Sequence, residues 1–254
     1  MTRALTFLSL VLATVACTQR ARPVAVAEET PPTVVVTQAG ATRAISIVEL
    51  FTSEGCSSCP PVDVIVNALP AREAERDVIV VAWHVDYWDS LGWPDPFATR
   101  ENTERQRAYA SALQQSGVYT PEVVLDGAES GRRNLADAIS HQTTAAAPME
   151  LSILSVTSSS LNVKYAAKGV PADARVVFVV VESGLVRTPD RGENRGRTLR
   201  HDHVARATKT TSPPSGEVTI ELATTIDRSR SELIAFVEQP ATMRKLAAAR
   251  VPLR

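Results

Sequence analysis

The sequence predicts an α/β domain followed by an all-β, sandwich-like domain, and three observations support this prediction. Two apolar, β-branched runs, residues 45–53 and 77–86, are typical of buried parallel strands, and a helical pattern lies between them. A polar helical segment, residues 97–117, precedes a short strand and an Asp-Gly turn at residues 122–127. After Pro148 the pattern changes to seven short apolar runs separated by turn signals, which favours an antiparallel sandwich.

Length and composition agree with this division. The chain has 254 residues, 44% of them hydrophobic, which is enough for one large domain or two small ones. We place the α/β domain at residues 44–147 and the β domain at residues 148–254. The formal net charge of -1 gives no indication of a nucleic-acid partner.

The first 16 residues have the pattern of a secretory signal peptide. Arg3 supplies the basic start, residues 5–15 are apolar, and the stretch is too short to be a good membrane span. Residues 17–43, rich in Pro, Ala, Thr and Val, predict a flexible tether. We therefore expect the chain to leave the cytoplasm, for the periplasm or the outer surface, where a disulfide can persist.

Cys17 is a candidate lipidation site. Small residues followed by Cys resemble a bacterial lipoprotein processing site, although Thr14 stands where that signal usually has Leu. Acylation would anchor the protein to a membrane through this lipid, with no other membrane contact expected. The alternative is cleavage near Ala16 without a lipid. In the acylated chain, Cys56 and Cys59 are the two remaining thiols.

The stretch CSSCPP, residues 56–61, fits a redox pair, a metal clip or a structural disulfide. At the start of a helix, Cys56 lies near unsatisfied N–H groups that lower a thiol pKa. We then expect Cys56 to be the exposed nucleophile and Cys59 the resolving thiol. Pro60 and Pro61 delay the regular helix to Pro61 and weaken this effect, which Ser57 and Ser58 could offset. A closed zinc site needs four ligands, so the pair alone is a weak metal site.

The order strand, Cys-x-x-Cys, helix, strand, helix, Thr120-Pro121 and strand resembles the thioredoxin fold. More narrowly, VELFTSEGCSSCPPVD, HVDYWDSLGWPDPFA, RQRAYA, GVYTPEVVLDG and RGENRGRTLRH resemble a bacterial secreted family with a thioredoxin-like region, catalogued as a domain of unknown function. This resemblance covers roughly residues 45–250 and brings no substrate with it. It implies that Pro121 is cis and lies against the disulfide.

Glu49 interrupts the first apolar run, seven residues before Cys56. A buried carboxyl is costly unless it is partnered or neutral, so we expect burial to raise its pKa. Thioredoxins use a buried carboxyl in a comparable place to move the proton of the second cysteine, and the resemblance gives Glu49 this role toward Cys59. The alternative is a partly solvated or ion-paired glutamate at the strand's rim.

The segment HVDYWDSLGW follows the second predicted strand. The carboxyl ends of parallel strands share one sheet edge, so this segment should lie near Cys56. Trp88 and Trp93 could form an apolar wall for a peptide or small thiol, and His84 could tune Cys56 or complete a metal site. The predicted substrate-binding residues are Thr120, His84, Tyr87, Trp88 and Trp93. The alternative is that the aromatic side chains only cover the sheet edge.

The segment RGENRGRTLRHDHV, residues 191–204, carries four arginines. Strand alternation would place His201 and His203 on one face as a two-ligand metal pair. We favour the other interpretation, a solvated hairpin.

We conclude that the sequence predicts an exported thiol-disulfide oxidoreductase without a cofactor. Its predicted catalytic residues are Cys56, Cys59, Pro121 and Glu49, and its partners are protein thiols or disulfides of the cell envelope. Two alternatives stay open. One is an envelope copper(I) chaperone with Cys56, Cys59 and His84 as ligands. The other is a sandwich that binds a partner while the two cysteines form only a structural disulfide.

Overall fold

The structure is a computed structural model that describes residues 45–73, 77–129, 135–140, 148–212 and 214–253. The predicted signal peptide, the tether and Cys17 lie outside these residues, so their assignments stay predictions. Within the described ranges, no helix is both long and apolar enough to cross a membrane.

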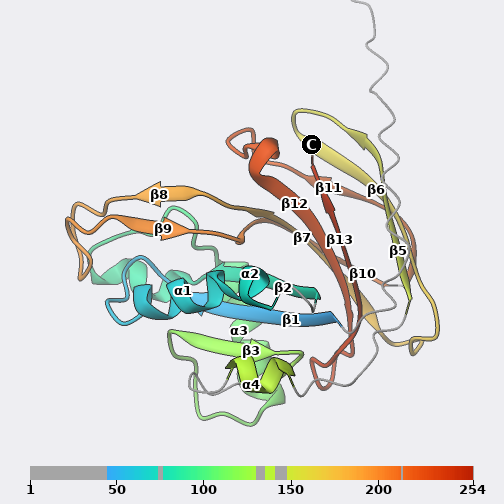
Figure 1. The fold of residues 1–254 in the computed structure, drawn as a ribbon, viewed down its shortest axis with the longest axis horizontal. Helices are drawn as coiled ribbons and strands as arrows, with labels where there is room; N and C mark the ends of the chain where they lie inside the picture. The colour runs from blue at the N-terminus through green and yellow to red at the C-terminus, as the bar shows by residue number, and fades with distance from the viewer. Residues whose placement is uncertain (1–44, 74–76, 130–134, 141–147, 213, 254) are drawn as a thin grey trace, which may run out of the picture. The chain divides into compact units, whose positions relative to one another are not determined.

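The two apolar runs form β1 (Ile45–Thr52) and β2 (Asp77–His84), which are parallel neighbours with Val48 beside Val80. They lie inside an eight-stranded sheet (Figure 1). Its spatial order is β13 (Lys245–Pro252), β12 (Ser231–Glu238), β7 (Arg175–Glu182), β10 (Val204–Thr211), β2, β1, β3 (Glu122–Leu125) and β4 (Ala128–Glu129). Because parallel strands need a crossover, α1 (Pro60–Asn67) and α2 (Leu69–Arg72) connect β1 to β2.

The remaining elements lie around this sheet. The polar segment forms α3 (Arg100–Ala112), whose first turn is capped by the Thr99 hydroxyl accepting the Asn102 N–H. The other helices are η1 (Asp86–Leu91), α4 (Leu135–Ser140) and η2 (Arg228–Arg230). A second sheet contains β5 (Met149–Val156), β6 (Ser160–Ala167) and β11 (Ser215–Glu221), and a hairpin contains β8 (Leu185–Arg187) and β9 (Leu199–His201).

The two faces of the large sheet carry different cores. Val48 and Leu50 of β1 pack with Val66 of α1, on the face that α1, α2 and α4 cover. Ile47 and Phe51 pack on the opposite face, in a core that also contains Tyr109 of α3. Even-numbered residues of β1 therefore face α1, and odd-numbered residues face α3. This alternation decides which side chains can reach the cysteine pair.

Part of the β-rich half continues the sheet of the first half, and part of it forms a separate sheet. Strands β7, β10, β12 and β13 extend the sheet that begins with β1 and β2, through Val204 beside Ala82. The three-stranded sheet packs on part of it, for example through Tyr165 of β6 against Phe178 of β7, whose ring centroids are 4.9 Å apart. The molecule thus has a mixed α/β core with one large sheet and additional small sheets. All described residues belong to one unit, residues 31–254, so the boundary at 147/148 stays a prediction about domains.

Candidate functional site

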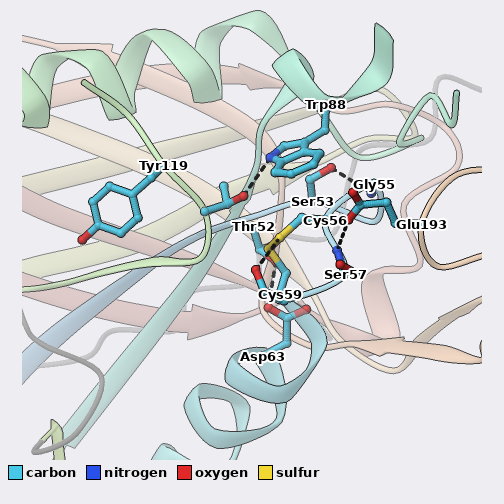
Figure 2. The surroundings of a disulfide bond; sticks show 12 residues. Thr52, Ser53, Gly55, Cys56, Ser57, Cys59, Asp63, Trp88, Tyr119 and Glu193 are labelled. Carbon is cyan, nitrogen blue, oxygen red and sulfur yellow. Dashed lines mark hydrogen bonds between the residues drawn. A yellow bond between two sulfur atoms is a disulfide. The ribbon is translucent and has the colours of Figure 1, made fainter. Parts of the chain in front are cut away.

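Cys56 and Cys59 form a disulfide at the junction between β1 and α1 (Figure 2). The chain leaves β1 in a tight turn, in which the Cys56 N–H donates to the Ser53 carbonyl at 3.2 Å. A second turn brings the cysteines together, because the Cys59 N–H donates to the Cys56 carbonyl at 3.3 Å. In Figure 2 the disulfide lies between Trp88 on one side and Asp63 on the other.

Both cysteines are 0% exposed, whereas Ser57 and Ser58 between them are exposed. The prediction of an exposed Cys56 is therefore wrong for this disulfide form. Trp88 packs on the backbone of Gly55, the residue before Cys56, since a Cβ placed on Gly55 would lie only 3.0 Å from the Cβ of Trp88. The Ser58 hydroxyl lies 3.4 Å from the Cys56 sulfur, in the place where it can donate to a thiolate.

The start of α1 offers the sulfurs few free N–H groups. The helix begins at Pro60, one residue earlier than predicted, with Cys59 at its N-cap. Proline has no N–H, so Pro60 and Pro61 remove two of the donors that a helix start normally presents. The N–H groups of Val62 and Asp63 both donate to the Cys59 carbonyl, at 2.9 and 3.0 Å. The stabilisation of negative charge at this helix end is correspondingly weak.

Asp63 is the buried carboxyl on the same side of the sheet as the cysteine pair. It lies four residues after Cys59 on the inner face of α1, is 7% exposed, and accepts a hydrogen bond from the Thr52 hydroxyl at 2.8 Å. Burial raises its pKa above the ordinary value, more than the Thr52 hydrogen bond lowers it. Asp63 was not among the predicted site residues, although the i, i+4 spacing from Cys59 places both residues on one helix face.

A group of buried polar residues lies beyond Asp63. His84, the last residue of β2, is hydrogen-bonded through Nδ1 to Asp95 at 2.6 Å, and His201 is bonded through Nε2 to Glu54 at 3.0 Å. The two imidazole ring centroids are 5.0 Å apart. Burial lowers the pKa of His84, but the Asp95 carboxylate outweighs it and raises this pKa above the ordinary value. The Asp95 carboxylate opposes ionisation of Asp63, whereas His84 and His201 favour it.

Of the predicted aromatic residues, Trp88 lies beside the disulfide (Figure 2), whereas Trp93 binds the buried carboxylate of Glu54. The Trp88 indole N–H donates to the Thr120 hydroxyl at 2.7 Å, and the Trp93 indole N–H donates to Glu54 at 2.7 Å. Tyr87 lies beside Trp88 with ring centroids 6.5 Å apart. The Thr120-Pro121 peptide bond is cis, as predicted. The substrate-binding roles of Thr120, His84, Tyr87, Trp88 and Trp93, and the catalytic role of Pro121, stay predictions.

The arginine-rich segment is a hairpin, but its tip lies on the cysteine motif. Glu193 accepts the Ser57 N–H at 2.9 Å (Figure 2), and the side-chain amide of buried Asn194 donates to the carbonyls of Glu54 and Cys56 at 2.8 and 2.9 Å. The sequence could not reveal these contacts, because about 140 residues separate the partners.

The histidine metal pair, the interpretation of this segment that we did not favour, does not form on one strand face. β9 ends at His201, and His203 has a positive φ of 56°, which breaks the alternation on which the pair depended. Among the residues that the structure describes, no three His, Cys, Asp or Glu side chains are grouped so that they could hold a metal ion.

Glu49 lies on the opposite face of the sheet, among positive charges. Its carboxylate binds the Arg105 guanidinium at 2.6 Å and the Lys245 ammonium at 3.0 Å, and accepts hydrogen bonds from Trp83 and the Tyr109 hydroxyl. Burial raises its pKa, but Arg105 and Lys245 together lower it below the ordinary value. The predicted upward shift is therefore wrong. Because odd-numbered β1 residues face α3, this position does not support proton transfer between Glu49 and Cys59.

Comparisons with known proteins add a family and a fold. A family model described as "Protein of unknown function (DUF1223)" matches residues 47–238. The solved structure of protein AGR_C_4864 from Agrobacterium tumefaciens is similar at 24% identity and a TM-score of 0.60, over 84% of this chain and 97% of that one. HBP35 of Porphyromonas gingivalis is similar at 13% identity and a TM-score of 0.61, over 84% of this chain and 76% of that one. These identities support a shared fold only, and no curated protein matches.

Proposed function

This chain belongs to the DUF1223 family of proteins of unknown function, and we propose that it is an exported, thioredoxin-like thiol-disulfide oxidoreductase. The observation that carries this proposal is the Cys56–Cys59 disulfide at the end of β1, with the buried carboxyl of Asp63 on the same face. A disulfide supplies the redox couple, and a carboxyl with a raised pKa supplies a proton carrier beside it.

In the proposed reaction, the reduced protein carries Cys56 as a thiolate. Its sulfur attacks a substrate disulfide and forms a mixed disulfide, while the other substrate sulfur leaves as a thiolate and takes up a proton. Cys59 then loses its proton and attacks the Cys56 sulfur. This step restores the Cys56–Cys59 bond and releases the second substrate thiol, so two electrons pass to the substrate. The reverse sequence oxidises a substrate dithiol.

Asp63 is the residue we assign to the proton of Cys59. A raised pKa makes its carboxylate a stronger base than an ordinary aspartate, which suits it to accept the proton of a thiol. Asp63 also lines a pocket of about 300 Å³ with Pro60, Pro61, Arg197 and His201. This pocket provides a route by which the proton can exchange with solvent.

The thioredoxin-like and exported parts of the proposal rest on further features. The order β1, cysteine pair, α1, β2, α3, Thr120-Pro121 and β3 supports the former. The signal-like residues 1–16 and the Cys17 motif support export and a lipid anchor. Fractionation of cells expressing the wild type and Cys17→Ser tests both. We expect the wild type in a membrane fraction outside the cytoplasm and the variant in the soluble exported fraction; a cytoplasmic wild type contradicts export.

One observation favours the rival function, in which the disulfide is structural. Both cysteines are 0% exposed, and Asn194 ties the hairpin to the Cys56 carbonyl. The test is to reduce the natively folded protein with dithiothreitol and to add a peptide disulfide. We expect the dithiol form to reduce the peptide catalytically. If the disulfide instead resists reduction until the protein unfolds, its role is structural.

A further inference from the structure

The surroundings of a redox pair decide in which direction it works. A pair whose thiolate is stabilised gives up its disulfide readily and is an oxidant, whereas a pair without such stabilisation keeps its disulfide and is a reductant. We propose that the Cys56–Cys59 couple is a reductant of protein disulfides, because Glu193 and the two prolines of α1 oppose negative charge on Cys56. This inference rests on the proposed thiol-disulfide exchange and adds its direction.

The first observation is the chemistry of the helix start. A cysteine before a helix gains most from the free N–H groups and the positive end of the helix dipole. Pro60 and Pro61 carry no N–H, and the next two N–H groups already donate to the Cys59 carbonyl. The start of α1 thus offers a Cys56 thiolate fewer N–H donors than an ordinary helix start does.

The second observation is the carboxylate of Glu193. It lies in the loop between β8 and β9 and accepts the N–H of Ser57, the residue that follows Cys56 (Figure 2). This contact has two effects in the same direction. It occupies a backbone donor next to Cys56, and it adds a negative charge close to the place where the thiolate forms. The hydrogen bonds from Ser57 lower the pKa of Glu193, so its charge persists at neutral pH.

The loop is built so that Glu193 stays in this place. The neighbouring Asn194 is 0% exposed and donates to two carbonyls of the cysteine turn. Arg197 donates to the Asn194 side-chain oxygen at 2.7 Å, which fixes the orientation of the amide. Gly192 packs on Trp93, where a Cβ would lie 2.9 Å from the Trp93 Cβ. Glu193, although exposed, is therefore a positioned charge, and it acts on Cys56 when the pair is reduced and a thiolate forms.

Among the described residues, the Ser58 hydroxyl and the cations Arg197 and Arg200, which line the pocket beside Pro60 and Pro61, act in the opposite direction. The Ser58 hydroxyl, 3.4 Å from the Cys56 sulfur, can donate one hydrogen bond to the thiolate. The hydroxyl is a neutral donor and weaker than a charged group, and Arg197 already donates to Asn194, so we expect the Glu193 carboxylate and the missing N–H groups to dominate. In the reductant direction, the two electrons come from a partner dithiol that reduces Cys56–Cys59. The resulting dithiol then passes them to a substrate disulfide, which becomes two thiols.

The test is the equilibrium of the pair with small thiols. The folded wild type and Glu193→Gln are incubated in buffers with dithiothreitol or glutathione at fixed ratios, and the dithiol fraction is measured by alkylation and mass spectrometry. We expect dithiothreitol to reduce the wild type and excess reduced glutathione to leave it mostly as the disulfide. Glu193→Gln should shift the equilibrium constant about three- to tenfold toward the dithiol, because glutamine keeps the acceptor and removes the charge.

Asp190→Asn is the matched control, since Asp190 lies in the same loop but pairs with exposed Arg191. It should leave the equilibrium constant unchanged. Complete reduction of the wild type by glutathione would overturn the proposal. So would a Glu193→Gln variant whose equilibrium constant is unchanged or shifted toward the disulfide. A pair that exchanges readily but is oxidising refutes only this direction, whereas a pair that exchanges with neither thiol refutes the proposed function itself.

Discussion

Replacement of Glu49 by Gln should destabilise the protein strongly and leave its thiol chemistry intact. Glu49 is 0% exposed and binds both Arg105 and Lys245. These two cations also share Glu238, which binds Arg175 as well, so the cluster contains two carboxylates and three cations. Glutamine has nearly the same shape as glutamate but no charge, and it leaves Glu238 to compensate all three cations alone.

The size of the loss follows from this burial. Removing one partner of a buried ion pair costs about 3–5 kcal/mol, because the remaining charge stays in a poorly solvated place. That is a large part of the roughly 5–15 kcal/mol by which a typical domain is stable. The pKa of Glu49 is lowered in the folded protein, so the stability that its ionised form contributes is present above about pH 4.5 and is lost as the pH falls through the folded-state value.

Urea unfolding of the oxidised protein at neutral pH measures the effect, with an unchanged slope as evidence that the folded state is intact. Glu150→Gln is the control, because Glu150 pairs with Lys168 on the surface and should cost at most about 1 kcal/mol. A loss below about 1 kcal/mol for Glu49→Gln would contradict the buried-network interpretation. Slower release of substrate from the mixed disulfide, in a variant of normal stability, would restore the catalytic role that the sequence predicted for Glu49.

Three further predictions concern single side chains. Asp63→Asn should keep the fold and slow the Cys59 step about a hundredfold at neutral pH, which single-turnover accumulation of the mixed disulfide measures; unchanged kinetics would remove Asp63 from the mechanism. Burial raises the pKa of Asp126 from 3.8 to about 6, so its contribution to stability should fall as the pH rises from about 4 to above 6, by at most about 3 kcal/mol. Urea unfolding of the wild type and Asp126→Asn across this range should show that difference, and parallel curves would refute it. Pro61→Ala returns an N–H to the start of α1 and should move the thiol equilibrium toward the dithiol, as Glu193→Gln does; a shift toward the disulfide would show that the prolines do not limit the stabilisation of Cys56.

Features that depend on local sequence were predictable. The apolar runs predicted β1 and β2 within two residues, the strand at Glu122–Leu125 has the predicted bounds, and Thr120-Pro121 is cis. The cysteines form a disulfide at the predicted junction. Each of these features follows from the residue pattern over a few positions, because backbone preference and burial determine the local structure there.

Features that depend on distant partners were not predictable. The sequence shows that Glu49 is in a buried strand, but its counter-ions Arg105 and Lys245 come from α3 and β13. Without them, burial alone predicts a raised pKa, which is the wrong direction. The prediction that Cys56 is exposed was wrong for the same reason. Asn194, from the distant hairpin, binds the Cys56 carbonyl, and Glu193 binds the N–H of Ser57. Strand periodicity likewise could not show that β10 pairs with β2.

Trapping of a mixed disulfide tests the proposed function most directly. Reduced Cys59→Ser is mixed with a peptide that contains a disulfide, and the products are identified by mass spectrometry beside Cys56→Ser and the wild type. If Cys56 is the attacking thiol, Cys59→Ser should accumulate a mixed disulfide through Cys56, Cys56→Ser should accumulate little, and the wild type should re-form the Cys56–Cys59 bond and release two peptide thiols. Absence of a mixed disulfide in the folded Cys59→Ser protein would contradict thiol-disulfide exchange and leave a structural disulfide.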